Sequence, residues 1–149
     1  MGQSLSQMYI HLVFGTKFRY PYISSAVEKE LHAYIAGALK KYESPAIKIN
    51  SVPDHIHILF RLSKNYALAK VVEEIKKESS KWMKAEGIEG FTRQIGYGAF
   101  SVSSSKVNVV KNYIIRQKEH HHVATFKEEI ETFIKEYEVI DYDEKYFWS

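Results

Sequence analysis

Residues 46–62 read AIKINSVPDHIHILFRL and predict two consecutive β-strands. In the first strand, residues 46–52, apolar and polar residues alternate as they do in a half-buried strand. Pro53 and Asp54 follow as a turn, because proline presets its φ angle and aspartate hydrogen-bonds the backbone of a turn. The second strand, residues 55–62, then runs back along the first. This stretch therefore predicts an antiparallel pair of strands.

The helices and strands on either side of this pair complete an α+β pattern. β-Branched and aromatic residues predict strands, and apolar residues at helical spacing predict amphipathic helices. The expected elements are a strand over 9–16, a helix over 27–42, strands over 46–52 and 55–62, a helix over 68–86, a strand over 97–103, a helix capped within 103–105 that runs through 117 toward 122, and a last helix over 126–137. The order β-α-β-β-α-β predicts a ferredoxin-like palm with an antiparallel sheet and additional C-terminal helices.

The composition indicates one globular domain over residues 1–149. The chain is 45% hydrophobic and 26% charged, and it is long enough to bury a core without disulfide bonds. It contains no cysteine, which excludes a disulfide scaffold, zinc fingers and thiol catalysis. The sequence contains no run of about 18 apolar residues of the kind that predicts a membrane span. Residues 1–7 lack the features of a signal peptide. We expect a cytoplasmic protein without a membrane partner.

The charge is unevenly distributed along the chain. Residues 126–149 hold three lysines and eight acidic residues, a net charge of −5, so the total of +3 leaves +8 for residues 1–125. A basic body permits binding to a polyanion such as nucleic acid, although an excess of this size is common in proteins without that role. We expect residues 126–149 to form an acidic helical extension that packs on the fold, with aromatic residues near its end that dock back or contact a partner subunit: Tyr142, Tyr146, Phe147 and Trp148.

Two histidines on the second strand of the pair are candidate metal ligands. His55 and His57 point to the same face because side chains alternate along a strand. Ile56, Ile58 and Phe60 face the opposite way into the expected core, so the imidazoles are expected to point outward. Paired imidazoles are good ligands for a divalent metal. The alternative is two half-exposed strand histidines with ordinary hydrogen bonds.

A tyrosine and a glutamine four residues apart form the second candidate motif. On a helix, Tyr113 and Gln117 lie about 40° apart and share one face. A tyrosine oxygen can act as a nucleophile that forms a covalent intermediate, and a glutamine carbonyl can complete the ligand set of a hard metal. The alternative is a helix tyrosine packed at the edge of the core.

A run of three histidines, His120-His121-His122, is a weaker metal candidate. Consecutive residues on a helix point in different directions, so they cannot easily converge on one ion. We expect a structural or solvent-exposed role for them.

Taken together, these motifs resemble the single-tyrosine HUH transposases of the insertion sequence 200/605 type. The similarity lies in the order and spacing of five segments. They are the first strand, the stretch over 53–59 with His55 and His57, residues 75–82 of the lysine-rich helix over 68–86, the strand over 96–103, and the Tyr113-x-x-x-Gln117 helix. It covers roughly residues 8–120.

The resemblance implies a metal-dependent DNA strand transferase. His55, His57 and Gln117 would bind Mg²⁺ or Mn²⁺, and Tyr113 would attack a phosphodiester of single-stranded DNA at a hairpin-bearing end. The products would be a 5′-phosphotyrosine link and a free 3′-OH that later reverses the reaction, without ATP or another nucleotide cofactor. Members of this family are homodimers, so the resemblance also implies a second copy as a partner.

Basic residues near aromatic ones are the candidate DNA contacts, because cations neutralise phosphates and aromatic rings stack on unpaired bases. The candidates are Lys17, Arg19, Lys76, Lys77 and Lys81. A solvated basic face is the alternative for each lysine. Two other functions stay open: a catalytically silent nucleic-acid-binding module, and a host-retained relative that processes palindromic repeats.

Overall fold

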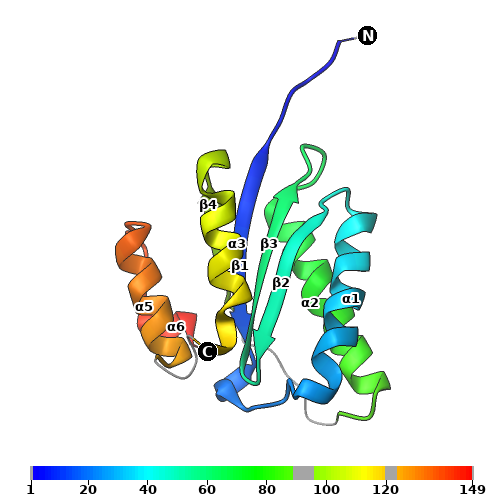
Figure 1. Ribbon diagram of the computed structural model, residues 1–149, viewed down its shortest axis with the longest axis vertical. Helices are drawn as coiled ribbons and strands as arrows, with labels where there is room; N and C mark the ends of the chain where they lie inside the picture. Colours follow the sequence, from blue (N-terminus) through cyan, green and yellow to red (C-terminus); the bar gives the residue numbers. More distant parts are fainter. Residues whose placement is uncertain (1, 89–95, 120–123, 149) are drawn as a thin grey trace.

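The computed structural model describes residues 2–88, 96–119 and 124–148 (Figure 1). The strands are β1 (Met8–Gly15), β2 (Ala46–Val52), β3 (His55–Leu62) and β4 (Gly98–Val102). The helices are α1 (Ser25–Lys41), α2 (Leu68–Ala85), α3 (Val107–Ile115), α5 (Phe126–Glu136) and α6 (Glu144–Phe147), with short 3-10 turns η1 (Lys17–Arg19) and η2 (Ser104–Lys106). The predicted strand pair is confirmed at both of its boundaries.

The four strands form one antiparallel sheet in the order β2-β3-β1-β4. This arrangement confirms the predicted ferredoxin-like α+β fold. β3 lies between β2 and β1, and its residue His57 pairs with Val13 on one side and with Asn50 on the other. β1 and β3 are the two central strands, so the side chains that they carry are set on strands hydrogen-bonded along both edges.

One face of the sheet holds the main core. Alternate residues of the central strands, Ile10, Leu12 and Phe14 from β1 with Ile56, Ile58 and Phe60 from β3, pack there against apolar residues of α1 and α2. The prediction that the three β3 residues enter the core is confirmed. Figure 1 shows α1 and α2 together on this side of the sheet.

The opposite face carries α3 and α5. Val13 of β1 lies in a cluster with Phe126, Ile130 and Phe133 of α5, and Leu59 of β3 lies in another with Ile114 of α3. The expected packing of the C-terminal extension on the fold is therefore confirmed. Phe147 and Trp148 also dock on the α5 cluster, which gives these two aromatic residues an intramolecular role.

The helix predicted to be capped within 103–105 and to run toward 122 ends earlier than expected, at Ile115. The side-chain amide of Asn50, on β2, donates to the carbonyl oxygens of Ile114 and Ile115 at 2.8 and 3.3 Å. These are orphan carbonyls of a helix end, so a strand side chain caps α3. A short helical stretch over 117–119 follows. The three histidines at 120–122 lie outside the described residues.

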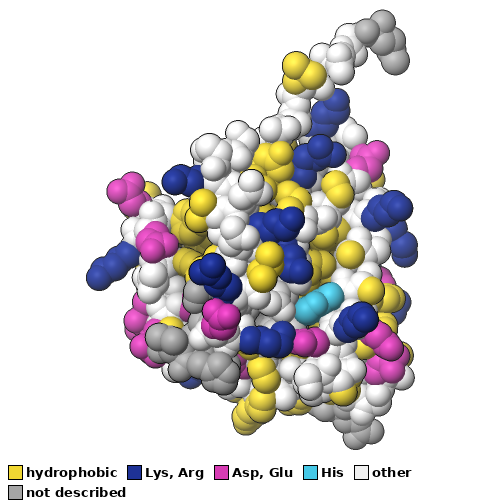
Figure 2. All heavy atoms as spheres, viewed as in Figure 1, with side chains coloured by type: hydrophobic (Ala, Val, Ile, Leu, Met, Phe, Trp, Pro, Cys, Tyr) yellow, Lys and Arg dark blue, Asp and Glu magenta, His cyan; other side chains and the backbone are white. Residues whose placement is uncertain are grey.

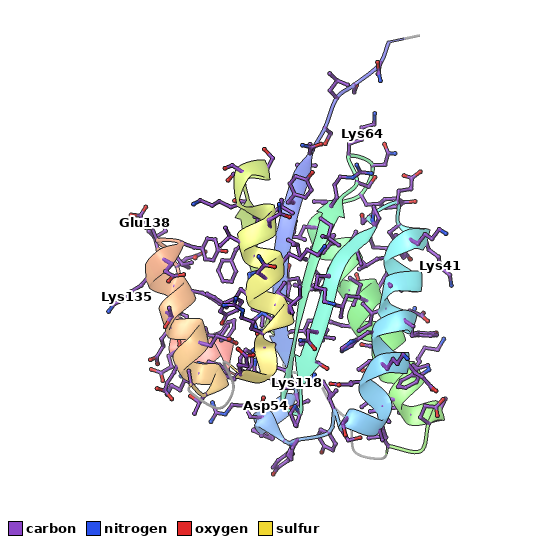
Figure 3. The ribbon with its side chains drawn as sticks, in the orientation of Figure 1. Lys41, Asp54, Lys64, Lys118, Lys135 and Glu138 are labelled. Carbon is purple, nitrogen blue, oxygen red and sulfur yellow. The ribbon has the colours of Figure 1, made fainter. Side chains whose placement is uncertain are left out.

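Lys118 anchors the chain that follows α3. Its ammonium group reaches the carboxylate of Glu28 at 3.1 Å, the side-chain oxygen of Asn50 at 3.2 Å and the backbone carbonyl of Ser51 at 3.4 Å. Figure 3 shows Lys118 and the Asp54 turn at the same end of the sheet. In the described parts of the chain, none of the helices has the length and apolar character required to cross a membrane.

We expect Ile58→Ala to destabilise the protein by about 2–5 kcal/mol, because the side chain is 0% exposed between the sheet and its helices and truncation leaves a cavity. Urea denaturation followed by circular dichroism measures this loss. Ile140→Ala is the matched control, since Ile140 is 98% exposed. An equal loss in both variants would contradict the assignment of the core.

Candidate functional site

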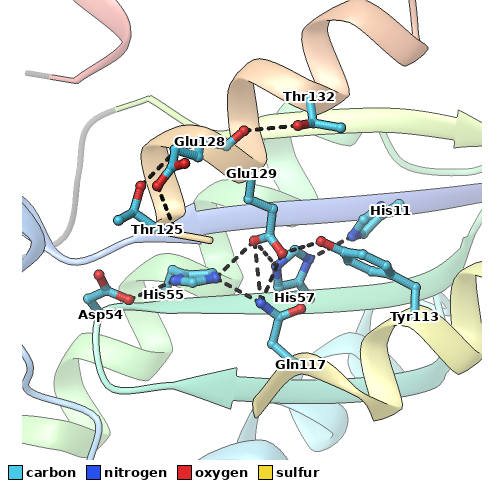
Figure 4. Close-up of polar contacts among 10 residues, drawn as sticks. All are labelled: His11, Asp54, His55, His57, Tyr113, Gln117, Thr125, Glu128, Glu129 and Thr132. Carbon is cyan, nitrogen blue, oxygen red and sulfur yellow. Dashed lines mark hydrogen bonds and ion pairs between the residues drawn. The ribbon is translucent and has the colours of Figure 1, made fainter. Parts of the chain in front are cut away.

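A buried carboxylate from α5 lies at the centre of a polar cluster on the α3 and α5 face (Figure 4). Oε1 of Glu129 lies 3.0 Å from Nε2 of His55 and 2.9 Å from Nε2 of His57. Oε2 of Glu129 accepts a short hydrogen bond from the hydroxyl of Tyr113. One carboxylate therefore joins both imidazoles to the phenol.

Gln117 completes the cluster. Its amide nitrogen lies 3.0 Å from Nε2 of His55 and 3.1 Å from Oε2 of Glu129. The structure thus brings together His55, His57, Tyr113 and Gln117, the four residues that the sequence singles out. The residue that joins them, Glu129, was not predicted from the sequence.

His55 is fixed from both sides of its ring. Its Nδ1 lies 2.7 Å from a carboxylate oxygen of Asp54, in the turn between β2 and β3. Its ring stacks on Phe126, with centroids 4.1 Å apart and planes inclined by 5°. Nδ1 of His55 faces Asp54, and the other ring nitrogen, Nε2, faces the centre of the cluster.

His57 is held by another histidine. Its Nδ1 lies 2.8 Å from Nε2 of His11, which comes from the neighbouring strand β1. His11 falls within the strand predicted over residues 9–16, and no sequence motif gives it a role. The alternation of side chains along the two strands could have predicted that His11 lies on the same face as His57. Leu12 and Ile58 face the main core, so their neighbours His11 and His57 both lie on the opposite face.

Two features of helix α5 place Glu129: the residue at which the helix begins and the apolar face that it buries. Thr125 caps the helix: its side chain accepts from the backbone nitrogen of Glu128, and the Glu128 carboxylate accepts from the backbone nitrogen of Thr125. Glu129 lies three residues after Phe126 and four before Phe133, so it shares their buried face. An acidic residue on the apolar side of a helix was the sequence signal that could have revealed it.

The expectation that the two histidines point outward to solvent is wrong. They do face away from the main core, but their side chains are only 1% and 0% exposed for His55 and His57. The reason is α5, which covers this face of the sheet with Phe126 and Phe133. In the space-filling view, cyan histidine surface is confined to one small patch (Figure 2).

The protonation preferences of the cluster follow from its hydrogen bonds. Burial alone would raise the pKa of Glu129, but hydrogen bonds from His55 and His57 outweigh it and hold this pKa below its usual value. Burial would lower the pKa of His55, yet the bonds to Asp54 and Glu129 raise it. Burial and the charge of Glu129 both raise the pKa of Tyr113. The arrangement therefore favours an ionised carboxylate beside a neutral phenol.

The donor atoms fit a divalent cation. Ligand atoms of His55, His57 and Glu129 lie within 4.8 Å of one another, and two imidazole nitrogens with a carboxylate oxygen are a common ligand set for such ions. The hydrogen bonds also conflict, since Nε2 of His55 cannot both donate to Glu129 and accept from Gln117. The buried Oε1 of Gln117 has no hydrogen-bond partner among the described residues. Rotation of this amide would turn an oxygen toward the centre, where a cation would satisfy it.

The candidate DNA contacts are divided between two parts of the molecule. Lys77 and Lys81 are exposed on α2, which covers the face opposite the cluster. Lys76 is only 8% exposed, with its ammonium group 5.9 Å from the ring centres of Phe14 and Tyr97, so it differs from the expected surface cation. Its position on the helix turns it toward the sheet rather than toward solvent.

Lys17 and Arg19 lie at the end of the sheet that holds His55. They belong to η1, directly after β1, and the backbone nitrogen of Thr16 donates to the carbonyl of Asp54 at 3.0 Å. Arg19 is exposed, and its guanidinium lies 5.3 Å from the ring centre of Trp148. These two cations therefore lie near the end of β3 that carries the candidate metal ligands.

A cleft of about 760 Å³ opens beside the cluster, between α3 and α5. Tyr113 and Glu129 line it, together with Lys106, Val109, Phe133 and Tyr137. Its walls combine aromatic and aliphatic surface with one cation, Lys106, and two carboxylates, Glu129 and Glu136. A substrate in this cleft would meet the Tyr113 side chain.

The chain belongs to the IS200-like transposase family, because the sequence model described as "Transposase IS200 like" matches residues 4–117. This finding confirms the resemblance seen in the motifs. The match ends at Gln117, so α5 and Glu129 lie outside it. No curated protein matches the chain.

Two solved structures share the fold. One is a protein of Deinococcus radiodurans R1 that is provisionally described as a transposase, with a TM-score of 0.62 and 18% identity over 78% of this chain and 96% of that chain. The other is the REP-associated tyrosine transposase bound to a REP hairpin, with a TM-score of 0.59 and 15% identity over 81% of this chain and 74% of that chain. At these identities the likeness concerns the fold.

We expect Glu129→Ala to weaken Mn²⁺ binding by about tenfold or more, because the cation would lose an anionic oxygen ligand. Isothermal titration calorimetry measures the affinity. Glu131→Ala is the control, since Glu131 is exposed on the same helix. An unchanged affinity for Glu129→Ala would exclude Glu129 from the ligand set.

Proposed function

We propose that this protein is a DNA transposase that cleaves and rejoins single-stranded DNA through Tyr113. The observation that carries the proposal is the meeting of the Tyr113 hydroxyl and the Nε2 atoms of His55 and His57 at one carboxylate. Membership of the IS200-like transposase family supports it. The complete set of side chains comes from a single copy of the chain.

We assign His55 and His57 as metal ligands, with oxygen donors from Gln117 and Glu129. Mg²⁺ or Mn²⁺ is the proposed ion, because oxygen ligands suit both and Mn²⁺ also accepts imidazole. When bound, the ion supplies Lewis-acid stabilisation to a non-bridging phosphate oxygen and orients the scissile bond. Asp54 and Phe126 hold the His55 ring in the orientation that this role needs.

Tyr113 is the proposed nucleophile. Its oxygen attacks phosphorus, the bond from phosphorus to the 3′ oxygen breaks, and the departing oxygen takes a proton to become a 3′-OH. The phenol must lose its own proton in this step, because its pKa is raised above the usual value by burial and by Glu129. Oε2 of Glu129 lies within hydrogen-bond reach of that proton. The 5′-phosphotyrosine link keeps the energy of the phosphodiester for rejoining.

The proposed substrate is single-stranded DNA at an end that carries a hairpin. The cleft beside Tyr113 is lined by Phe133 and Tyr137, whose rings can stack on unpaired bases, and by Lys106, which can contact a phosphate. The solved relative bound to a REP hairpin has the same fold. Residues 1–125, with a net charge of +8, match a polyanionic partner.

A second copy of the chain is a further proposed partner, carried only by the resemblance to dimeric family members. Size-exclusion chromatography with light scattering tests it directly. A monomer would contradict the dimer without affecting the proposed chemistry, since Tyr113 already reaches the histidines of its own chain through Glu129.

We expect a denaturant-resistant adduct when the protein is incubated with single-stranded hairpin DNA and Mn²⁺, and no adduct with Tyr113→Phe. The reason is that only the phenol oxygen can form the phosphotyrosine bond. Denaturing gel electrophoresis of labelled DNA detects the adduct. Tyr137→Phe, a change in the same cleft, should retain it.

An adduct that persists in Tyr113→Phe would refute the assignment of the nucleophile. DNA binding without an adduct in the wild-type protein, across a library of hairpins, would instead favour the silent binding module.

We expect the affinity for single-stranded DNA to fall steeply with salt, and the dependence to be shallower in a Lys17→Ala, Arg19→Ala double variant. Each lost phosphate contact reduces the slope of log affinity against log salt by about 0.7. Fluorescence anisotropy at several salt concentrations gives the slope. A Lys77→Ala, Lys81→Ala double variant is the charge-matched control, because both residues lie on α2. A larger effect in that control would place the DNA on the α2 face.

A further inference from the structure

We propose that His11 is a positioning residue that fixes the tautomer of His57, so that Nε2 of His57 presents a lone pair to the cation. The proposal rests on the metal site of the proposed function. It concerns a residue to which the motifs assign no role. It also explains why an imidazole, rather than an apolar side chain, occupies a buried position of the central strand β1.

The contact between the two histidines is short and enclosed. Nε2 of His11 lies 2.8 Å from Nδ1 of His57, and both side chains are buried. The two rings are stacked, with centroids 5.1 Å apart and planes inclined by 28°. Since β1 and β3 are paired along their lengths, the backbone on which this contact rests is set by the sheet itself.

His11 is a neutral imidazole in this environment. Its side chain is 1% exposed, and its Nδ1 has no hydrogen-bond partner among the described residues, so nothing beside that nitrogen replaces the water that a charged ring would need. A neutral imidazole carries one N–H group and one lone pair. His11 can therefore either donate to His57 or accept from it, and the choice determines where the proton of His57 resides.

Only one of these two states is compatible with a ligand at Nε2 of His57. That nitrogen must be unprotonated to bind a cation, so the neutral ring keeps its proton on Nδ1. Nδ1 of His57 then donates to Nε2 of His11, and the proton of His11 resides on its own Nδ1. Nδ1 of His11 is buried and has no hydrogen-bond partner among the described residues, so no second bond on this ring opposes that tautomer.

The two proposed ligands are thus oriented by different acceptors. With a cation at both Nε2 atoms, His55 would donate from Nδ1 to the carboxylate of Asp54, and His57 would donate from Nδ1 to a neutral ring. A carboxylate acceptor makes the donating imidazole more basic, whereas a neutral acceptor fixes the tautomer without adding negative charge. His11 therefore orients His57 and leaves Glu129 as the buried anion at the centre.

The ring of His11 is itself held by aromatic edges. It lies 5.3 Å from Phe133, 6.2 Å from Phe100 and 6.4 Å from Tyr113, measured between ring centroids in edge-on arrangements. These neighbours keep the imidazole plane in place. A phenyl ring would occupy the same space, so His11→Phe removes the acceptor while it preserves most of the packing.

We expect His11→Phe to weaken the binding of Mn²⁺ by about 10–100-fold, as loss of the partner of a metal-bound histidine typically does. Isothermal titration calorimetry measures the affinity, and thermal denaturation checks that the variant unfolds cooperatively. His11→Gln offers an amide oxygen as acceptor and should restore most of the affinity. His32→Phe is the control, because His32 makes a comparable 2.8 Å bond to Ser51 on the α1 side of the sheet.

A second measurement reads the tautomer directly. In the Mg²⁺-bound wild-type protein, ¹⁵N NMR of the imidazoles should show both His11 and His57 protonated at Nδ1. In His11→Phe the Nδ1 signal of His57 should lose the signature of a hydrogen bond to an imidazole nitrogen.

The outcomes separate this inference from the function on which it rests. Wild-type Mn²⁺ affinity in His11→Phe, or a His57 protonated at Nε2 in the Mg²⁺-bound protein, would overturn the role of His11 and leave the metal site intact. A wild-type protein that binds neither ion would refute the proposed metal site, and the role of His11 with it.

Discussion

The structure depends on how one buried negative charge is compensated. A carboxylate taken out of water is costly unless charged or hydrogen-bonding groups replace its hydration. Glu129 is 6% exposed, and its replacement partners are two imidazoles, an amide and a phenol from three different elements. Each of these elements must therefore take its position for α5 to dock. The docking of α5 and the hydrogen bonds of the polar cluster therefore stabilise each other.

Much of this architecture could be predicted from local sequence. The alternation in β3 sets Ile56 and Ile58 toward the main core and His55 and His57 to the other face, and the structure agrees. The spacing of Phe126, Ile130 and Phe133 predicts the helix that packs on the fold. These predictions succeed because strand and helix periodicity depend on neighbours within a few residues.

Contacts between distant segments could not be predicted in the same way. Glu129 meets His57 across 72 residues, and Asn50 caps the end of α3 across 64. Periodicity gives the face on which a residue lies, but not the surface that covers it, so the burial of the histidines was missed. Lys76 shows the same limit. Its place on a lysine-rich helix suggests that the side chain is exposed to solvent. The packing of that helix instead puts the ammonium group between Phe14 and Tyr97.

The cap that Asn50 provides also has a mechanical consequence for α3. The two hydrogen bonds that the Asn50 side chain donates tie the C-terminal end of α3 to β2. The contacts of Lys118 with the same strand add to this attachment. Any tilt of α3 that keeps these bonds must pivot about that end. Tyr113 lies close to the pivot and Val107 lies almost two turns away, so the start of the helix would swing through a much larger arc than the phenol. The cleft could thus change width at its Lys106 end while the Tyr113 side chain stays nearly in place.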